Sequence, residues 1–300
     1  MSQSTTRGVL AMFVAVAAFS FMDALLKLFS AHYPPLQVSA IRALASLPFV
    51  LAPLAWSGRL AELKPVRVLP HLLRGVLGVV MLGTFVFALR GQSMADVYSI
   101  YMAAPLLIVM LAALLLGERV DLGRWLAILL GLAGVIVILQ PTGSGLGWFA
   151  GVAAVASALC YALGVIVARV MTRTERSSTM VFSFLAVVAV VCTALSLPGW
   201  VSIEAAHWPW IAAVGVLGTI GQHGITEAFR HAPASVIAPF EYTALLWGVA
   251  IDWAFWDVLP GARVFFGGGL VIAAGLYLIW RERRLHRELA ASIESPASMH

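Results

Sequence analysis

Gly75-Val76-Leu77-Gly78 recurs about 140 positions later as Gly215-Val216-Leu217-Gly218, and the same shift lays Arg90 on Arg230. Each copy contains about five apolar segments long enough to cross a bilayer. Because five is an odd number of crossings, the second copy enters the membrane upside down relative to the first. The sequence therefore predicts an inverted repeat, the architecture through which many secondary transporters alternate access.

Composition indicates independently that lipid surrounds most of the chain. Of the 300 residues, 61% are hydrophobic and 11% are charged, and the mean hydropathy is +0.95. That leaves too little polar surface to solvate a globule of 32.0 kDa. The net charge of +5 does not indicate nucleic-acid binding, because the basic residues lie between apolar stretches or in the tail. Cys160 and Cys192 lie within apolar runs, so no disulfide is expected.

Runs of about 17 to 25 apolar residues mark spanning helices. Ten are predicted, at 8–30, 36–56, 72–90, 94–117, 124–140, 148–170, 178–198, 208–230, 233–254 and 264–280. The expected fold is an all-α polytopic membrane protein of ten transmembrane helices in two inverted five-helix repeats. The repeats occupy 8–140 and 147–284, with a short connector at 140–145 and a polar tail at 285–300 that extends the last helix and then frays.

The placement of Lys and Arg predicts the orientation. With a cytoplasmic N-terminus, fifteen of the nineteen basic residues fall on the cytoplasmic side, as the positive-inside rule requires. Only Arg90 and Arg263 fall at outer ends, and Lys27 and Arg42 fall within spans. We therefore expect a multi-pass protein of the cell inner membrane with both termini in the cytoplasm, and a first span that is retained rather than cleaved as a signal.

An ionisable side chain within the bilayer is costly and needs a partner, a cavity or a route to the headgroups. Glu241 is the first candidate for substrate binding or coupling, because it lies inside the ninth span where Pro239 removes a backbone donor. Tyr242 follows Glu241. The counterpart of Glu241 in the first repeat is Tyr101, which lies three residues after Tyr98. The alternative is a protonated Glu241 that only holds helices together.

Asp23 and Lys27 lie four residues apart in the first span, and Arg42 begins the second span on the same side. The spacing places Asp23 and Lys27 on one helix face, where they neutralise each other. If the basic side chains face inward, they supply cations for a carboxylate or phosphate on the substrate. The alternative is that Lys27 and Arg42 extend to the outer headgroups.

His223, Glu227 and Arg230 form a polar stripe in the eighth span. The stripe is interpreted as half of a substrate path or a proton relay, or else as an interfacial pair of Glu227 with Arg230. Two candidate ligands on one helix do not complete a metal site, so no metal is predicted.

Asp252, near the outer end of the ninth span, is interpreted as part of an interfacial aromatic belt. Trp247 and Tyr242 follow Glu241 closely enough to form an aromatic wall, which suits a planar or cationic substrate. The remaining acidic residues at span ends are expected to be caps or gate contacts; these are Asp96, Glu118, Asp121 and Asp257.

Small residues in the fifth and tenth spans predict close helix packing. They are Ala127, Gly131 and Gly134 in the fifth span, and Gly267, Gly268, Gly269 and Gly275 in the tenth. A homodimer contact and a contact within one protomer explain this pattern equally well.

Several of these features together resemble the drug/metabolite transporter superfamily, specifically bacterial proteins with two EamA-type repeats. The resemblance covers residues 8–284 and rests on Lys27, Arg42, Pro105 with Leu116-Gly117-Glu118-Arg119, and Gly131-Leu132-Ala133-Gly134-Val135. It implies a central cavity formed largely by spans 1, 3, 4, 6, 8 and 9, with spans 5 and 10 peripheral. That arrangement would direct Glu241, Tyr101, His223 and Tyr161 toward the cavity.

The second repeat departs from the family pattern, because Phe255-Trp256-Asp257 replaces the Gly-Glu pair that the first repeat retains. The stretch 238–247 resembles a branch whose members have been assigned flavin, S-adenosylmethionine and amino-acid-like substrates.

The expected function is a secondary transporter, with no cofactor, whose partners are membrane lipid and a small polar or zwitterionic organic metabolite. The metabolite is amino-acid-like or a related compound such as an opine-type metallophore, and export is slightly favoured. The sequence lacks the phosphate-binding motif of ATP-driven proteins. The alternatives are an uptake carrier for riboflavin or S-adenosylmethionine and, as a minor one, a membrane-embedded enzyme or a non-transporting sensor.

Overall fold

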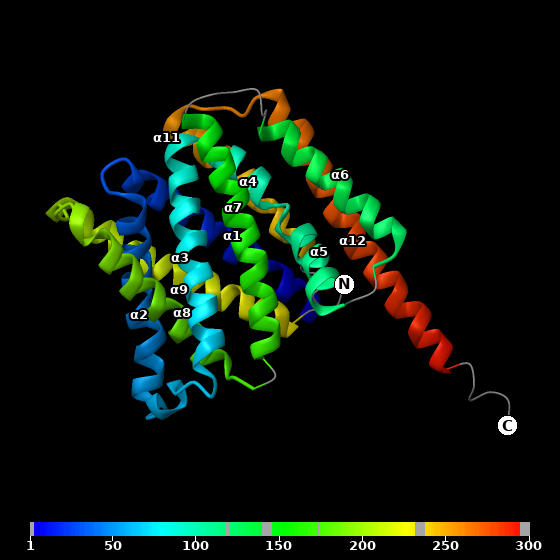
Figure 1. Cartoon of the computed structure of the whole chain (residues 1–300), viewed down its shortest axis with the longest axis horizontal. Helices are drawn as coiled ribbons and strands as arrows, with labels where there is room; N and C mark the ends of the chain where they lie inside the picture. The colour runs from blue at the N-terminus through cyan, green and yellow to red at the C-terminus, as the bar shows by residue number, and fades with distance from the viewer. Residues whose placement is uncertain (1–2, 118–119, 140–145, 173, 232–237, 295–300) are drawn as a thin grey trace.

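The protein is described here by a computed structural model covering residues 3–117, 120–139, 146–172, 174–231 and 238–294, and the regular elements of these segments are all helices (Figure 1). The first repeat comprises α1 (Gln3–Ser30), α2 (Pro35–Trp56), η1 (Leu60–Leu63), α3 (Val68–Gly91), α4 (Met94–Tyr101), α5 (Ala104–Leu116) and α6 (Leu122–Leu139). The second comprises α7 (Leu146–Met171), α8 (Ser177–Ser196), η2 (Leu197–Gly199), η3 (Ala205–His207), α9 (Trp208–His231), η4 (Ala238–Tyr242), α11 (Thr243–Trp256) and α12 (Ala262–Glu294).

The chain is a multi-pass membrane protein. Eight segments of the described chain are long and apolar enough to span a bilayer, with α4 and α5 counted together. Helix α9, and η4 with α11, are the remaining crossings, which confirms the ten-helix prediction. The connector 140–145 lies outside the described residues, as do Glu118 and Arg119.

Two faces of the bundle are defined by the connections between the helices. The terminal face is the one at which α1 begins, and it also carries the connections α2–α3 and α7–α8, which touch each other through Val66 and Glu175. The opposite face carries the connections α1–α2 and α8–α9, which meet where Tyr33 contacts His207. Successive connections therefore alternate between the faces, as ten crossings require.

The packing of the helices is that of an inverted repeat. Helix α1 packs along α9, and α3 packs along α7, so the first helix of each repeat lies against the third helix of the other. The equivalent helices α2 and α8 pack together at one edge, and α6 and α12 pack together at the other (Figure 1).

The fourth span differs from the prediction of one continuous helix over 94–117. The chain breaks between α4 and α5 at Met102 and Ala103, and Pro105 lies in the first turn of α5, where its missing N–H removes no helical hydrogen bond. The ninth span is also interrupted, because the short helix η4 precedes α11. Tyr101 and Glu241, which are 140 positions apart, therefore both lie at helix breaks.

The glycines of the fifth and tenth spans bring α6 and α12 together within one protomer. A methyl group on Gly134 would come 2.6 Å from the carbonyl oxygen of Gly267, and one on Gly131 would overlap Leu106. A methyl group on Gly275 would overlap the hydroxyl of Tyr242. These contacts account for Gly131, Gly134, Gly267 and Gly275 within the protomer, whereas Gly269 faces open space. A homodimer stays a prediction.

The two halves also end their fourth and ninth spans in the same way. Gly117 follows α5 with φ 68°, and Asp257 follows α11 with φ 54°. Both residues are in the left-handed conformation that commonly ends a helix. The departure noted at Phe255-Trp256-Asp257 therefore keeps the backbone turn but places it on an aspartate.

Candidate functional site

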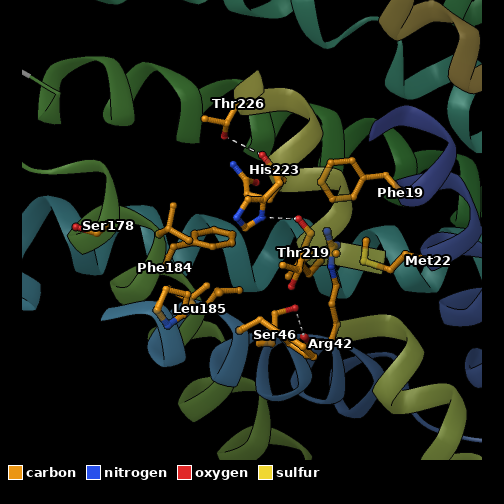
Figure 2. A pocket seen from close by; sticks show the side chains of 18 of the residues that line it. Phe19, Met22, Arg42, Ser46, Ser178, Phe184, Leu185, Thr219, His223 and Thr226 are labelled. Carbon is orange, nitrogen blue, oxygen red and sulfur yellow. Dashed lines mark hydrogen bonds between the residues drawn. The ribbon is translucent and has the colours of Figure 1, made fainter. Parts of the chain in front are cut away.

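A cavity of about 570 Å³ occupies the part of the bundle between its middle and the terminal face (Figure 2). Its lining residues come from α1, α2, α3, α8 and α9. Most of the wall is apolar, and Phe19, Met22, Phe184 and Leu185 surround the polar groups in Figure 2. A concave, mainly apolar site with a few polar groups is typical of small-molecule binding.

Two arginines line the cavity at different depths. Arg42 lies fourteen residues before the end of α2, and Arg74 lies six residues after the start of α3. At 1.5 Å per residue, they are roughly 21 Å and roughly 9 Å from the terminal ends of their helices. Arg42 therefore belongs to the deep end of the cavity, and Arg74 lies nearer the mouth.

Different groups surround the two guanidinium groups. Arg74 donates one hydrogen bond from Nη1 to the carbonyl oxygen of Met180 at 2.8 Å, and its guanidinium lies 4.9 Å from the ring centroid of Phe184. Among the described residues, the guanidinium of Arg42 has no hydrogen bond or ion pair, and its charge acts on Asp23. Most donors of both groups therefore remain available.

The other polar groups of the cavity are a histidine, several hydroxyls and an amide. Nδ1 of His223 lies 3.0 Å from the carbonyl oxygen of Thr219. The hydroxyls of Ser46, Thr219 and Thr226 donate to carbonyl oxygens of their own helices. Their oxygens therefore offer acceptors, while Gln222 adds an exposed amide to the wall.

An ion pair occupies the other half of the bundle, between the middle and the opposite face. Nζ of Lys27 lies 2.6 Å from Oδ1 of Asp252, whose side chain is fully buried. The ammonium also lies 4.4 Å from the ring centroid of Trp256, and Oδ2 of Asp252 accepts a hydrogen bond of 2.9 Å from the N–H of Ala95. These contacts join α1, α4 and α11.

Two predictions need correction at this point. Lys27 pairs with Asp252 rather than with Asp23, and Asp252 is buried rather than part of an interfacial belt. Asp23 instead accepts a hydrogen bond of 3.0 Å from the hydroxyl of Tyr98. Its other oxygen is buried without a hydrogen-bond partner in the structure. The spacing of Asp23 and Lys27 predicts that they share a face of α1, but it carries no information about Asp252, the partner that α11 supplies.

Tyr101, Tyr161 and Glu241 lie outside the lining of the cavity. The ring of Tyr101 packs against Phe85 and Tyr161, with centroids 5.5 Å and 5.4 Å away. Glu241 is exposed in η4, and its charge acts on Tyr161 and Tyr242. The expected lining of spans 1, 3, 4, 6, 8 and 9 therefore differs from the cavity observed, which takes its described lining from spans 1, 2, 3, 7 and 8.

Tyr242 and Trp247 do not form one wall beside Glu241. Tyr242 is buried, and its hydroxyl lies against Gly275 without a hydrogen-bond partner in the structure. Trp247 packs against α1, with its ring 5.4 Å from Phe13 and 5.8 Å from Phe21.

The polar stripe on α9 is partly as expected. His223 and Glu227 both line a second hollow of about 450 Å³ between α1 and α9. Glu227 forms a pair with His231, at 3.2 Å between Oε2 and Nε2. The side chain of Arg230 lies outside the described part of the structure. Within the described residues, no group of three or more His, Cys, Asp or Glu side chains is placed to hold a metal ion.

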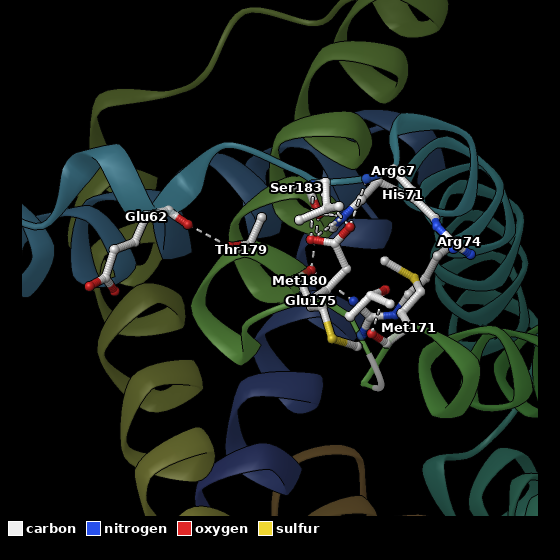
Figure 3. A network of polar contacts seen from close by, with 11 residues as sticks. Glu62, Arg67, His71, Arg74, Met171, Glu175, Thr179, Met180 and Ser183 are labelled. Carbon is white, nitrogen blue, oxygen red and sulfur yellow. Dashed lines mark hydrogen bonds and ion pairs between the residues drawn. The ribbon is translucent and has the colours of Figure 1, made fainter.

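A polar contact ties two connections together at the terminal face (Figure 3). The carboxylate of Glu175 accepts hydrogen bonds from the N–H groups of Val66, at 3.0 and 3.2 Å, and Arg67, at 2.8 Å. Nε2 of His71 lies 3.4 Å from the same carboxylate. Burial alone raises the pKa of Glu175, but the two N–H groups and His71 outweigh it and hold the pKa below its usual value.

The opposite face has a related contact between the equivalent connections. The hydroxyl of Tyr33 lies 2.6 Å from Nδ1 of His207 and accepts a hydrogen bond of 3.1 Å from the N–H of Glu204. In both contacts a side chain from the first connection of one repeat meets a histidine and backbone N–H groups of the other repeat. The residue types differ between the copies, so the sequence repeat gives no signal for either contact.

Comparison with known proteins identifies what the chain is similar to. The sequence model of the EamA-like transporter family matches residues 6–140 and 148–281. The pseudopaline exporter of Pseudomonas aeruginosa is 27% identical over 272 residues, which are 90% of this chain and 95% of the exporter. The riboflavin transporter of Rhizobium johnstonii is 29% identical over 221 residues, which are 73% of each chain. A solved crystal structure matches with a TM-score of 0.63 at 19% identity, covering 93% of this chain and 99% of the other, which supports the fold alone.

Proposed function

The chain belongs to the EamA-like transporter family, and from this premise we propose that it is a secondary carrier for a small polar or zwitterionic organic metabolite, working by alternating access. The family is one of transporters rather than enzymes. Neither the substrate nor the direction follows from membership alone, so both rest on the geometry and on the relatives.

The observation that supports this proposal is the difference between the two halves of the bundle along the membrane normal. The cavity extends from the middle of the bundle toward the terminal face, whereas the half toward the opposite face contains the Lys27–Asp252 pair. A site accessible from one side and obstructed on the other is one state of an alternating-access cycle. The inverted repeat supplies the second state, in which the two halves exchange roles.

The terminal face is proposed to be cytoplasmic, because most basic residues fall there. The protein then lies in the cell inner membrane with both termini in the cytoplasm, and the structure represents an inward-facing state. Export is slightly favoured, and the pseudopaline exporter is a relative that matches nearly the whole chain. Uptake is the alternative, and the riboflavin transporter is the relative that favours it.

Glu241 is proposed as a coupling group rather than as a substrate ligand. It lies at the η4 break, acts electrostatically on Tyr161, and is absent from the cavity lining. Arg42 and His223, which do line the cavity, are the predicted candidates best placed to touch a substrate.

Counterflow in proteoliposomes tests the proposed function. The purified protein is reconstituted, and vesicles loaded with unlabelled compounds from a metabolite panel are assayed for accumulation of the labelled form. A carrier produces transient accumulation that protein-free vesicles lack. If none of the amino acids, flavins, S-adenosylmethionine, carboxylates and opine-type metallophores in the panel exchanges, the substrate class is wrong. A ligand that stabilises the protein without being exchanged would indicate a sensor instead.

A further inference from the structure

We propose that the cavity selects an organic anion whose acidic group is bound at the deep end by Arg42, with Arg74 attracting it nearer the mouth and with its apolar part against the wall around Phe184. This inference rests on the proposed function, since it names the substrate class of the same site. A carboxylate and a phosphate share the chemistry that a guanidinium recognises.

The charges around the cavity carry the inference. Of the described residues, the lining includes two arginines and neither an aspartate nor a glutamate. Asp23, beyond the lining, is the acidic group on which Arg42 acts. Counting Arg42 and Arg74 as +1 each and Asp23 as −1 leaves a net charge of +1 with His223 neutral. A ligand with a negative charge complements that balance, and a cation opposes it.

The immediate surroundings of Arg74 leave its positive charge uncompensated. Among the residues that the structure describes, its side-chain partners are the carbonyl oxygen of Met180 and the ring of Phe184, neither of which carries a formal charge. A cation held at membrane depth is unfavourable unless a partner or a water-filled cavity compensates it. Because the cavity provides access, the missing partner can be the substrate.

Arg42 has the geometry of a binding group. Its guanidinium reaches into the cavity beside Thr219 and Met22 (Figure 2), and its planar donors match the two oxygens of a carboxylate. The hydrogen bond from Tyr98 already holds one oxygen of Asp23, so Asp23 does not engage Arg42 as a bidentate partner. The two arginines lie at different depths. Arg74 therefore attracts the anion near the mouth, and Arg42 binds it at the deep end.

The apolar wall defines the rest of the substrate. Phe19 and Met22 from α1, Phe49 from α2 and Phe184 from α8 face the same space. A small inorganic anion would leave this surface uncovered, whereas an organic anion with an aromatic or branched aliphatic part would cover it.

A charge-matched series on one ring tests the proposal by thermal shift. The probes are phenylacetate and phenyl phosphate as anions, phenethylamine as the cation and 2-phenylethanol as the neutral compound. A ligand that binds the folded state raises its melting temperature. We expect stabilisation by at least one anion and not by the amine or the alcohol, and the better anion identifies the preferred acidic group.

Three variants separate the roles of the arginines. Arg42→Gln should weaken binding of that anion about 10- to 100-fold, the range for charge-assisted hydrogen bonds, and Arg42→Lys should retain part of it. Arg74→Gln should mainly slow association and reduce its dependence on salt. Arg59→Gln is the matched control, because it removes the same charge from an exposed loop arginine paired with Glu62.

The outcomes distinguish this inference from the proposed function. Equal stabilisation by amine, alcohol and anion, no stabilisation by either anion, or undiminished anion binding in Arg42→Gln would overturn the anion site. Counterflow of a metabolite that has no acidic group would overturn it too, while leaving the carrier function intact. Anion binding that depends on Arg42 without any exchange in proteoliposomes would support the site and count against the carrier.

Discussion

Lys27 and Asp252 are 225 positions apart in the chain, yet Nζ of one lies 2.6 Å from Oδ1 of the other. The lysine side chain is 12% exposed and the aspartate side chain is fully buried. The pair joins the first span to the ninth, on the side of the bundle away from the cavity. Opening a path through that half requires these two charges to separate or to move together.

Replacing Lys27 by Met should strongly destabilise the protein. The variant leaves the Asp252 carboxylate buried with only the N–H of Ala95 as a partner, and removing one member of a buried ion pair typically costs about 3–5 kcal/mol. Unfolding by SDS in mixed micelles measures the difference.

The double variant Lys27→Met with Asp252→Asn is the control, because it removes both charges. It should recover most of the lost stability, since no uncompensated charge remains. Equal stability of the single variant and wild type would mean that Lys27 and Asp252 do not form a buried ion pair in the membrane.

The Glu175 contact predicts a specific response to acid. Its pKa is lowered in the folded protein from an ordinary value of 4.5, so the unfolded chain takes up the proton first. The stabilising contribution is therefore fully present above about pH 4.5 and is lost as the pH falls through the folded pKa.

Glu175→Gln, which cannot ionise, should melt at a lower temperature than wild type at pH 7. The gap should narrow below about pH 4.5, where the unfolded wild-type chain begins to take up the proton, and close as the pH falls through the folded pKa. Melting curves of the two proteins between pH 7 and pH 3.5 measure it. A gap that is constant across this range would show that the charge of Glu175 does not carry the contact.

The sequence predicts the architecture well because the membrane requires only coarse features of each spanning segment. A span needs only length and apolar composition, and the repeat of Gly75–Gly78 at Gly215–Gly218 adds the inversion. The break at Met102 is not predicted because the apolar stretch continues through it into α5. Hydropathy does not distinguish a continuous helix from two short ones in line.

Replacing Asp257 by glycine should stabilise the protein. Its φ of 54° lies in the left-handed region, which a residue with a Cβ occupies at a cost and glycine does not. Asp257→Gly should raise stability by about 0.5–1 kcal/mol, and Asp257→Val should lower it. SDS unfolding ranks the three proteins. Stability in the order Val, Asp, Gly from highest to lowest would contradict this backbone conformation.

Labelling of engineered cysteines should place the two faces on opposite sides of the membrane. Ser57 follows α2 at the terminal face, and Gly199 ends η2 at the opposite face with open space around it. In a background with Cys160 and Cys192 replaced by Ala, an impermeant maleimide applied to cells should label Gly199→Cys and not Ser57→Cys. The reverse pattern would invert the proposed orientation, and labelling of both or neither would break the topology.

The candidate site was harder to predict than the fold, because it depends on contacts between distant elements. Depth in the membrane selected Arg42 and His223, which line the cavity. It did not select Arg74, since a basic residue near a span end is ordinary in sequence and becomes informative only when α8 supplies Met180 and Phe184 around it. The Tyr33 and Glu175 contacts lie in connections, where hydropathy carries no signal.

Glu241→Gln should separate substrate binding from coupling. Glu241 lies outside the cavity lining, so the variant should bind the stabilising ligand as tightly as wild type. A glutamine neither takes up nor releases a proton, whereas an ionisable carboxyl group at membrane depth is suited to that role. Transport driven by a proton gradient should therefore fall and lose its pH dependence, while exchange without a gradient continues.

Matched assays on one preparation decide the role of Glu241. Ligand titration by thermal shift reports binding, counterflow reports exchange, and accumulation under an imposed pH gradient reports coupling. Tyr101→Phe is the companion variant, because Tyr101 occupies the equivalent position of the first repeat without an ionisable carboxyl, and it should retain the pH dependence. An unchanged rate and pH dependence in Glu241→Gln would remove Glu241 as the coupling group, and loss of binding would make it a substrate ligand despite its place outside the cavity.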